Sequence, residues 1–259
     1  MGKTASTQKG PSGGFIGKNP FTLPRSVHHH LKKCVETHAQ EKRDEAGYVE
    51  YLWIDISDEK LAASKKKRRA ATTLGLDEWL NVIDEAATLG VHCVLVHVGD
   101  SFSAYPDVWA ICEWAQRTHG MMVGLHVHSR SFSEADLRQL RRLDLAKACL
   151  FVDGAAYENM GNLRTAGIPL CAADVTEADC SAPCDMPECM VYVGAEGRLY
   201  SCGLVVGQKN YCLGSVLESR LDRVVRDAAR PRTVSERPPG NDCNGCPPIM
   251  AKRAREARS

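Results

Sequence analysis

Residues 76–99 contain the pattern that decides the fold: LDEWLNVIDEAATLG (76–90) followed by VHCVLVHVG (91–99). The first segment repeats apolar side chains at helical spacing and ends at a glycine. Its apolar face is formed by Leu76, Trp79, Leu80, Ile83 and Ala87. The second segment is a short apolar run of strand length. A helix followed by a buried strand is the repeating unit of parallel α/β sheets.

The same unit recurs on both sides of this stretch. The predicted strands cover residues 48–57, 91–99, 121–128, 148–154 and 168–175, and the predicted helices cover 76–90, 106–120, 133–143 and 156–167. Ser133 and Asp136 are spaced as a capping box at one helix start, and Gly120 ends another helix. Five βα units are fewer than the eight of a complete barrel. We therefore predict an α/β fold, an incomplete parallel barrel of about five units.

The pattern changes after Asp174. Residues 180–216 read as a cysteine-rich β-hairpin around a Glu196-Gly197 turn, and 215–230 as an amphipathic helix. These changes predict four parts: a mobile leader and N-terminal helix (1–46), the βα domain (47–175), a small hairpin-and-helix domain (176–250) and a basic tail (251–259).

Composition excludes several classes of protein. The chain has 33 Lys+Arg against 32 Asp+Glu, a net charge of +1, so we do not expect a nucleic-acid partner. It contains no apolar run long enough to span a bilayer. The N-terminus lacks the apolar core of a signal peptide, so we expect a cytoplasmic protein.

Cysteine is the unusual component, since eight of the 12 cysteines fall between Cys171 and Cys246. In a reducing compartment such clustering favours metal over disulfides. The candidate ligands are Cys184 and Cys202 at the ends of the hairpin, and Cys243 and Cys246 of a CxxC. Four converging thiolates can hold a 4Fe–4S cluster or a zinc ion. Three other cysteines leave the ligand set open, because Cys180 or Cys189 could replace Cys184, and Cys212 could replace a ligand or belong to the core.

The spacing of these cysteines resembles a known domain. Cys184, twelve residues, Gly197, four residues and Cys202, followed by CxxC, are similar to the twitch form of the SPASM domain, which carries an auxiliary iron–sulfur cluster behind the barrel of radical SAM enzymes. The upstream half is similar to the radical SAM domain itself, with YVEYLWIDIS (48–57) as its first strand. Val98-Gly99-Asp100-Ser101 stands where that family has a Gly-Gly-Glu-Pro segment that holds S-adenosylmethionine.

The defining motif of that family is absent. Radical SAM enzymes have CxxxCxxC after the first strand, and the corresponding positions here are Asp58, Ala62 and Lys65. No cysteine lies between Cys34 and Cys93. We therefore expect a degenerate radical SAM-like protein that does not cleave S-adenosylmethionine.

A second candidate site follows from the strand ends, where parallel α/β folds bind ligands. His97, Asp100, His126 and His128 all stand there. His126 and His128 are two residues apart on one strand, so their rings face the same side. Asp55, Asp58, Asp153 and Asp174 end other strands. Such a group could bind a ligand or a metal, or do acid–base work; polar residues near loops also occur without any role.

The leading hypothesis is a 4Fe–4S protein without radical chemistry that relays electrons or serves as an accessory, substrate-binding subunit to a redox or enzyme partner. One alternative is a non-radical metalloenzyme that uses the cluster or the His/Asp site as a Lewis acid. Another is a scaffold stabilised by zinc. The sequence alone does not decide whether the protein is an enzyme.

Overall fold

The computed structural model describes residues 48–57, 73–129, 131–158, 160–174, 183–235 and 245–257. All of them belong to one compact unit, residues 43–259. The predicted leader and N-terminal helix, the boundary near residue 175, and Asp58, Cys180 and Cys243 lie outside the described residues.

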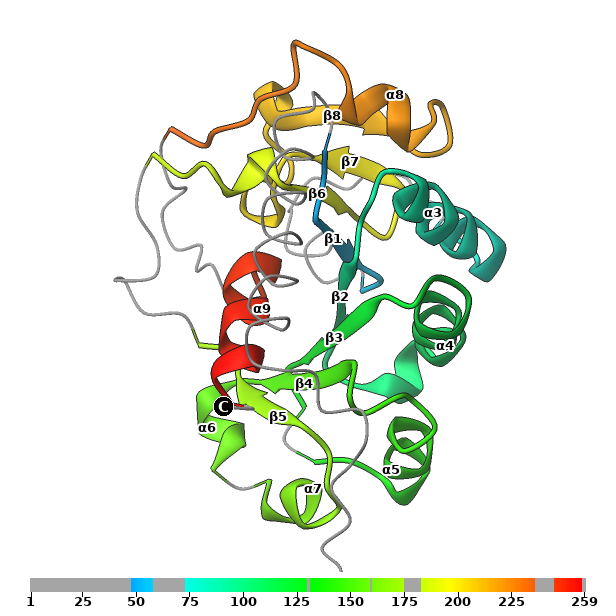
Figure 1. Ribbon diagram of the computed structural model, residues 1–259, viewed down its shortest axis with the longest axis vertical. Helices are drawn as coiled ribbons and strands as arrows, with labels where there is room; N and C mark the ends of the chain where they lie inside the picture. Colours follow the sequence, from blue (N-terminus) through cyan, green and yellow to red (C-terminus); the bar gives the residue numbers. More distant parts are fainter. Residues whose placement is uncertain are drawn as a thin grey trace, which may run out of the picture. The chain divides into compact units, whose positions relative to one another are not determined.

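The described strands form one eight-stranded sheet (Figure 1). The strands are β1 (Tyr51–Asp55), β2 (Cys93–Gly99), β3 (Met122–Val127), β4 (Ala148–Val152), β5 (Leu170–Ala172), β6 (Met190–Val193), β7 (Arg198–Tyr200) and β8 (Cys212–Ser215). Their order across the sheet is β5-β4-β3-β2-β1-β6-β7-β8. The ladders between β5 and β6 in this order are parallel, and β7 and β8 add antiparallel pairs. The α/β class is confirmed, and each of the five predicted strands contains one of β1–β5.

The helices are α3 (Leu76–Thr88), α4 (Val108–His119), α5 (Glu134–Leu140), α6 (Gly154–Tyr157), α7 (Gly161–Thr165), α8 (Leu221–Val225) and α9 (Pro247–Glu256). Short 3₁₀ turns are η1 (Phe102–Ala104), η3 (Met186–Glu188), η4 (Gly203–Val205) and η5 (Lys209–Tyr211). The predicted capping box is confirmed, because the Ser133 hydroxyl accepts from the Asp136 N–H and the Asp136 carboxylate accepts from the Ser133 N–H. Gly120 ends α4 at φ 68°, a conformation that suits glycine.

The two faces of the sheet have different covers. Figure 1 shows α3, α4 and α5 along one face and α9 on the other. Because successive strand residues point to opposite faces, Leu52 and Ile54 pack on the α3–α5 side, whereas Tyr51 and Trp53 pack on the α9 side. The functional residues described below all come from the α9 side.

Two sequence predictions in the C-terminal half are wrong in detail. The helix predicted over 215–230 is only α8 (Leu221–Val225), because residues 212–215 pair with β7 and the Ser215 hydroxyl accepts from the N–H of Leu217 in the following turn. The segment expected as a basic tail (251–259) starts inside α9 instead: Ala251 is buried against the sheet, next to Ile249 and Met250 of the same helix, and the helix continues to Glu256.

The C-terminal hairpin continues the main sheet. β6 pairs with β1 in parallel, from Tyr51 opposite Met190 to Ile54 opposite Val193. The hairpin turn falls at the predicted place, with Gly197 at φ 77° between β6 and β7. One sheet therefore runs through the segments before and after residue 175.

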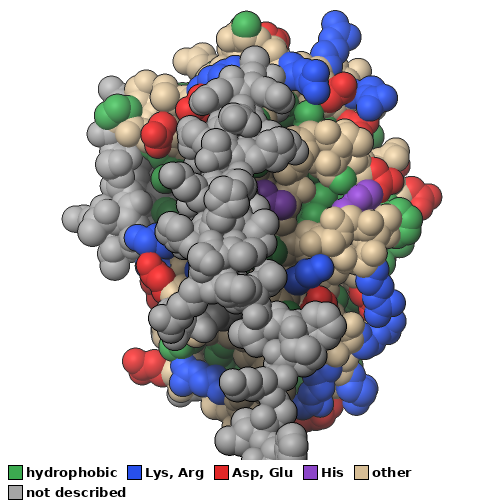
Figure 2. Space-filling model, viewed as in Figure 1, with side chains coloured by type: hydrophobic (Ala, Val, Ile, Leu, Met, Phe, Trp, Pro, Cys, Tyr) green, Lys and Arg blue, Asp and Glu red, His purple; other side chains and the backbone are tan. Residues whose placement is uncertain are grey.

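The visible surface carries both signs of charge. On the face in Figure 2, Lys and Arg side chains are interspersed with Asp and Glu side chains. Among the described residues, no helix has both the length and the hydropathy that a membrane crossing needs.

Candidate functional site

Three histidines meet at the carboxyl ends of two neighbouring strands. His97 on β2 stands opposite His126 on β3 in the parallel ladder, and His128 follows β3 directly. His97 and His126 are buried, while the His128 side chain remains 35% exposed. The three predicted histidines are therefore brought together in one cluster, on the α9 side of the sheet.

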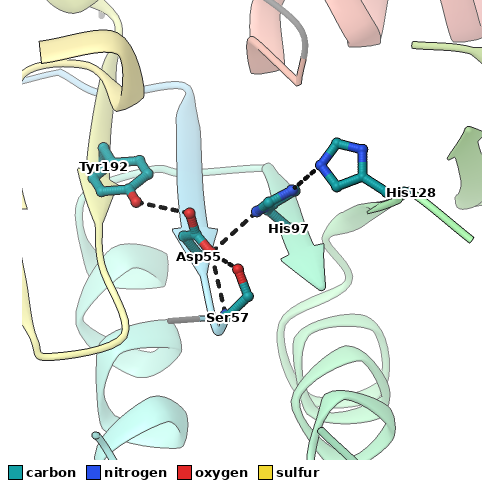
Figure 3. Close-up of polar contacts among 5 residues, drawn as sticks. All are labelled: Asp55, Ser57, His97, His128 and Tyr192. Atoms are coloured by element: carbon teal, nitrogen blue, oxygen red, sulfur yellow. Dashed lines mark hydrogen bonds and ion pairs between the residues drawn. The ribbon is translucent and has the colours of Figure 1, made fainter. Parts of the chain in front are cut away.

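A buried carboxylate fixes the first imidazole (Figure 3). His97 Nδ1 lies 3.0 Å from Asp55 Oδ1. Asp55 also accepts hydrogen bonds from the Tyr192 hydroxyl, at 3.0 Å, and from the Ser57 hydroxyl and N–H, at 2.7 and 3.1 Å. Burial, followed by the neighbouring Asp55 charge, raises the pKa of Tyr192 well above its usual value, so that its hydroxyl remains a donor. These bonds hold the His97 ring in one orientation.

The second carboxylate, Asp153, follows β4 and faces the other two rings. Its oxygens lie 3.0 and 3.2 Å from His128 Nδ1, and 3.8 Å separates Asp153 Oδ1 from His126 Nε2. The imidazoles of His126 and His128 lower the pKa of the Asp153 carboxyl to about 2. Asp153 is therefore ionised and acts as a hydrogen-bond acceptor.

His126 is the buried centre of the group. Burial lowers its pKa to about 4, so the ring is neutral near pH 7. Neither ring nitrogen has a hydrogen-bond partner. His126, His128 and Asp153 each offer one ligand atom, and these three atoms lie within 4.8 Å of one another. Among the described residues, this is the only group of three His, Cys, Asp or Glu side chains that meets this distance. Imidazole and carboxylate donors of this kind suit a transition-metal ion.

Asp100, the fourth residue predicted for this site, lies in the turn after β2 and is exposed. The structure places Asp55 and Asp153 beside the histidines instead. The sequence had shown both as strand ends, but it gave no signal for Ser57 or Tyr192. Tyr192 is recognised only when β6 is known to lie beside β1.

The predicted cysteine ligands gather on the same face. Cys202 precedes η4 and Cys246 precedes α9; both are buried in the apolar cluster that contains Trp53, and half-buried Cys184 packs against that cluster. Cys189 and Cys212 also pack there, so they remain alternative ligands.

Two glycines bring the cysteine segments close to the sheet. A Cβ on Gly203, next to Cys202, would lie 2.7 Å from the Trp53 ring. A Cβ on Gly245, next to Cys246, would lie 2.7 Å from His126 Nδ1 and 3.4 Å from the same tryptophan. The cysteine cluster and the histidine cluster are therefore neighbours.

Comparisons with known proteins identify the fold. No protein-family model and no curated protein matches the chain. BtrN, solved in complex with AdoMet and 2-DOIA, is 9% identical, with 70% of this chain and 83% of that chain covered at a TM-score of 0.53. Native anSMEcpe with bound AdoMet is 8% identical (69% and 81% covered, TM-score 0.47), and Streptococcus suis SuiB is 9% identical (82% and 74% covered, TM-score 0.46).

These three are radical SAM enzymes, and the likeness to BtrN gives this chain a radical SAM-like fold. Such a fold implies a cluster that binds S-adenosylmethionine through three thiolates. The residues do not fit that group, because the sequence has no cysteine between Cys34 and Cys93. We therefore assign no step to S-adenosylmethionine.

Proposed function

We propose that the protein is an iron–sulfur protein that carries electrons to or from a protein partner without radical SAM chemistry. Cys184, Cys202, Cys243 and Cys246 are the proposed ligands of a 4Fe–4S cluster. Four protein thiolates leave no iron open to a substrate, which favours electron relay over catalysis at the cluster.

The observation that carries this proposal is the close packing of the cysteine segments on Trp53. Cys202 and Cys246 are remote in sequence, yet a glycine beside each allows the backbone to approach the sheet. Buried thiols in an apolar shell fit a cluster, whose potential depends on solvent exposure. The cysteine spacing in the sequence supports the same ligand set.

The test is metal and sulfide analysis of protein purified without oxygen. About four irons and four acid-labile sulfides per chain are expected, with broad absorption near 400 nm. Cys246→Ala and Cys202→Ala should lose the iron. Cys112→Ala is the matched control, because Cys112 is a buried cysteine of α4 on the opposite face of the sheet.

Three results contradict the proposal. One zinc without sulfide makes the cysteine site a structural zinc site, and retention of iron in both variants removes these cysteines as ligands. Formation of 5′-deoxyadenosine from S-adenosylmethionine under reducing conditions contradicts the absence of radical chemistry.

A further inference from the structure

Residues 230–234, which follow α8 in the chain, are hydrogen-bonded to two segments that carry proposed cluster ligands. Val234 exchanges backbone hydrogen bonds of 2.8 and 2.9 Å with Cys184. The serine before Cys202 donates its hydroxyl to the carbonyl of Pro231 at 2.8 Å. The segment is therefore held beside two of the proposed ligands.

Arg230 begins this segment and places a charged group in the interior. The residue is 6% exposed, and its Nη2 donates to the carbonyls of Pro187 and Met190. These carbonyls lie on either side of Cys189, the alternative to Cys184 in the ligand set. The guanidinium is therefore buried against the loop that carries a third cysteine.

No carboxylate of the described residues balances this charge through an ion pair. Glu188, in the loop that Arg230 contacts, pairs with the exposed side of Arg232 at 3.6 Å instead. The Nε of Arg230 has no hydrogen-bond partner. Burial, followed by the neighbouring Arg232 charge, lowers the pKa of Arg230 to about 10, so the guanidinium remains charged near pH 7. A buried charge without a counter-charge is costly, so an anion is expected close to Arg230.

The cysteines next to Arg230 can supply this anion. The nearby Cys189 acts on Arg230 electrostatically and favours the charged guanidinium. A 4Fe–4S cluster with four thiolate ligands carries a net negative charge, and reduction of the cluster adds one more. Net charge is one of the factors that set the reduction potential of such a cluster.

We propose that Arg230 is the counter-charge of the cysteine-held cluster and raises its reduction potential. This inference rests on the proposed iron–sulfur function. Arg230 acts through its charge and is not a ligand. A fixed cation stabilises the reduced cluster more than the oxidised one, because the reduced cluster is more negative. At about 10 Å, with an effective dielectric constant of about 20, a unit charge changes such an equilibrium by about tenfold.

The test is a potentiometric titration of the full-length protein purified without oxygen. Arg230→Gln removes the charge and keeps an amide donor. It should shift the reduction equilibrium by about tenfold toward the oxidised cluster, which lowers the midpoint potential of a one-electron couple by about 59 mV. Arg230→Lys keeps the charge, so its midpoint potential should stay close to that of the wild type.

Arg232→Gln is the matched control. Arg232 lies in the same segment, but its side chain is 40% exposed. Water screens an exposed charge, so this variant should change the midpoint potential much less than Arg230→Gln does. Equal shifts in the two variants would assign the effect to surface charge and overturn the proposal.

Stability separates a counter-charge from an arginine that serves the fold alone. Arg230→Met should destabilise the iron-loaded protein more than the metal-free protein, because only the iron-loaded protein loses a charge partner. Urea unfolding of both forms makes the comparison. Equal losses in the two forms would overturn the proposal. Failure of both Arg230→Gln and Arg230→Met to fold without metal would do the same, since the fold itself would then need the arginine.

The outcomes distinguish this inference from the proposal on which it rests. Wild-type protein without iron contradicts the proposed function itself. Iron-loaded wild type and iron-loaded Arg230→Gln with the same midpoint potential overturn only the role of Arg230.

Discussion

At the scale of single residues, His126 couples the site to pH. Its pKa is lowered from 6.5 to about 4 by burial, so between these values the unfolded chain binds more protons than the folded one. Stability from this residue is therefore present above pH 6.5 and is lost as the pH falls toward 4. The loss between pH 7 and pH 5 is about 2 kcal/mol.

Urea unfolding of the chelator-treated wild type at both pH values measures this change. The wild type should lose about 2 kcal/mol more than His126→Gln, which cannot take up the proton. Because other titrating groups are common to both proteins, the difference between them isolates His126. Equal losses in the two proteins would show that the buried imidazole is not kept neutral by folding.

Gly203 is a second residue whose role is steric. A Cβ at this position would lie 2.7–3.0 Å from three atoms of the Trp53 ring, and that ring is 1% exposed. Gly203→Ala should therefore cost about 1–3 kcal/mol through overpacking and displace Cys202 from the sheet. Thermal unfolding and iron content measure the two effects together.

The matched control is Gly161→Ala in α7, where an added Cβ meets nothing within 4 Å. This control should keep both stability and iron. If Gly203→Ala also kept its thermal stability and its iron, neither the stability nor the iron site would depend on the close approach of Gly203 to Trp53.

The residues of the site differ in how far the sequence could predict them. His97, His126 and His128 were predicted, because their strands are adjacent in sequence and parallel strands end at one edge. The support of Asp55 by Tyr192 was not predicted. The two residues are 137 positions apart, and they meet only through the parallel pairing of β1 with β6. Local periodicity contains no information on such a pairing.

At the scale of elements, α9 is the helix that the sequence did not reveal. Its apolar residues Ile249, Met250 and Ala251 are too few for a clear helical period, and the basic residues around them suggested a tail. In the structure α9 covers the face of the sheet that contains Trp53 and the cysteines. Cys246 directly precedes α9, so the position of this proposed ligand depends on how α9 packs against the sheet.

Met250 tests the importance of this helix, because it is 1% exposed. Met250→Ala should destabilise the protein by about 2–5 kcal/mol, the usual cost of truncating a buried Met. Lys252→Ala, at an exposed position of the same helix, should change the free energy of unfolding by less than about 0.5 kcal/mol. Chemical denaturation of both variants makes the comparison, and a small effect at Met250 would mean that α9 does not pack stably on the sheet.

At the scale of the whole molecule, the parallel pairing of β6 with β1 joins the two halves of the chain in one sheet. The sequence suggested two parts divided near residue 175, since the cysteine pattern begins there. The sheet instead continues from β1 into β6, β7 and β8, and α9 contacts β1, β2, β3 and β5. Strand β1 therefore lies between β2, which precedes residue 175 in the chain, and β6, which follows it.

A chain that ends at Asp174 should therefore fail to fold cooperatively. Without β6 and α9, β1 becomes an edge strand, and the buried side chains of Tyr51, Trp53 and Phe151 are exposed to water. Exposed apolar edges of this kind promote aggregation. Expression of residues 1–174 should give insoluble protein or a broad, non-cooperative thermal transition, whereas the full chain should unfold in one transition. A soluble 1–174 fragment with a sharp transition would show that the βα half is an independent domain.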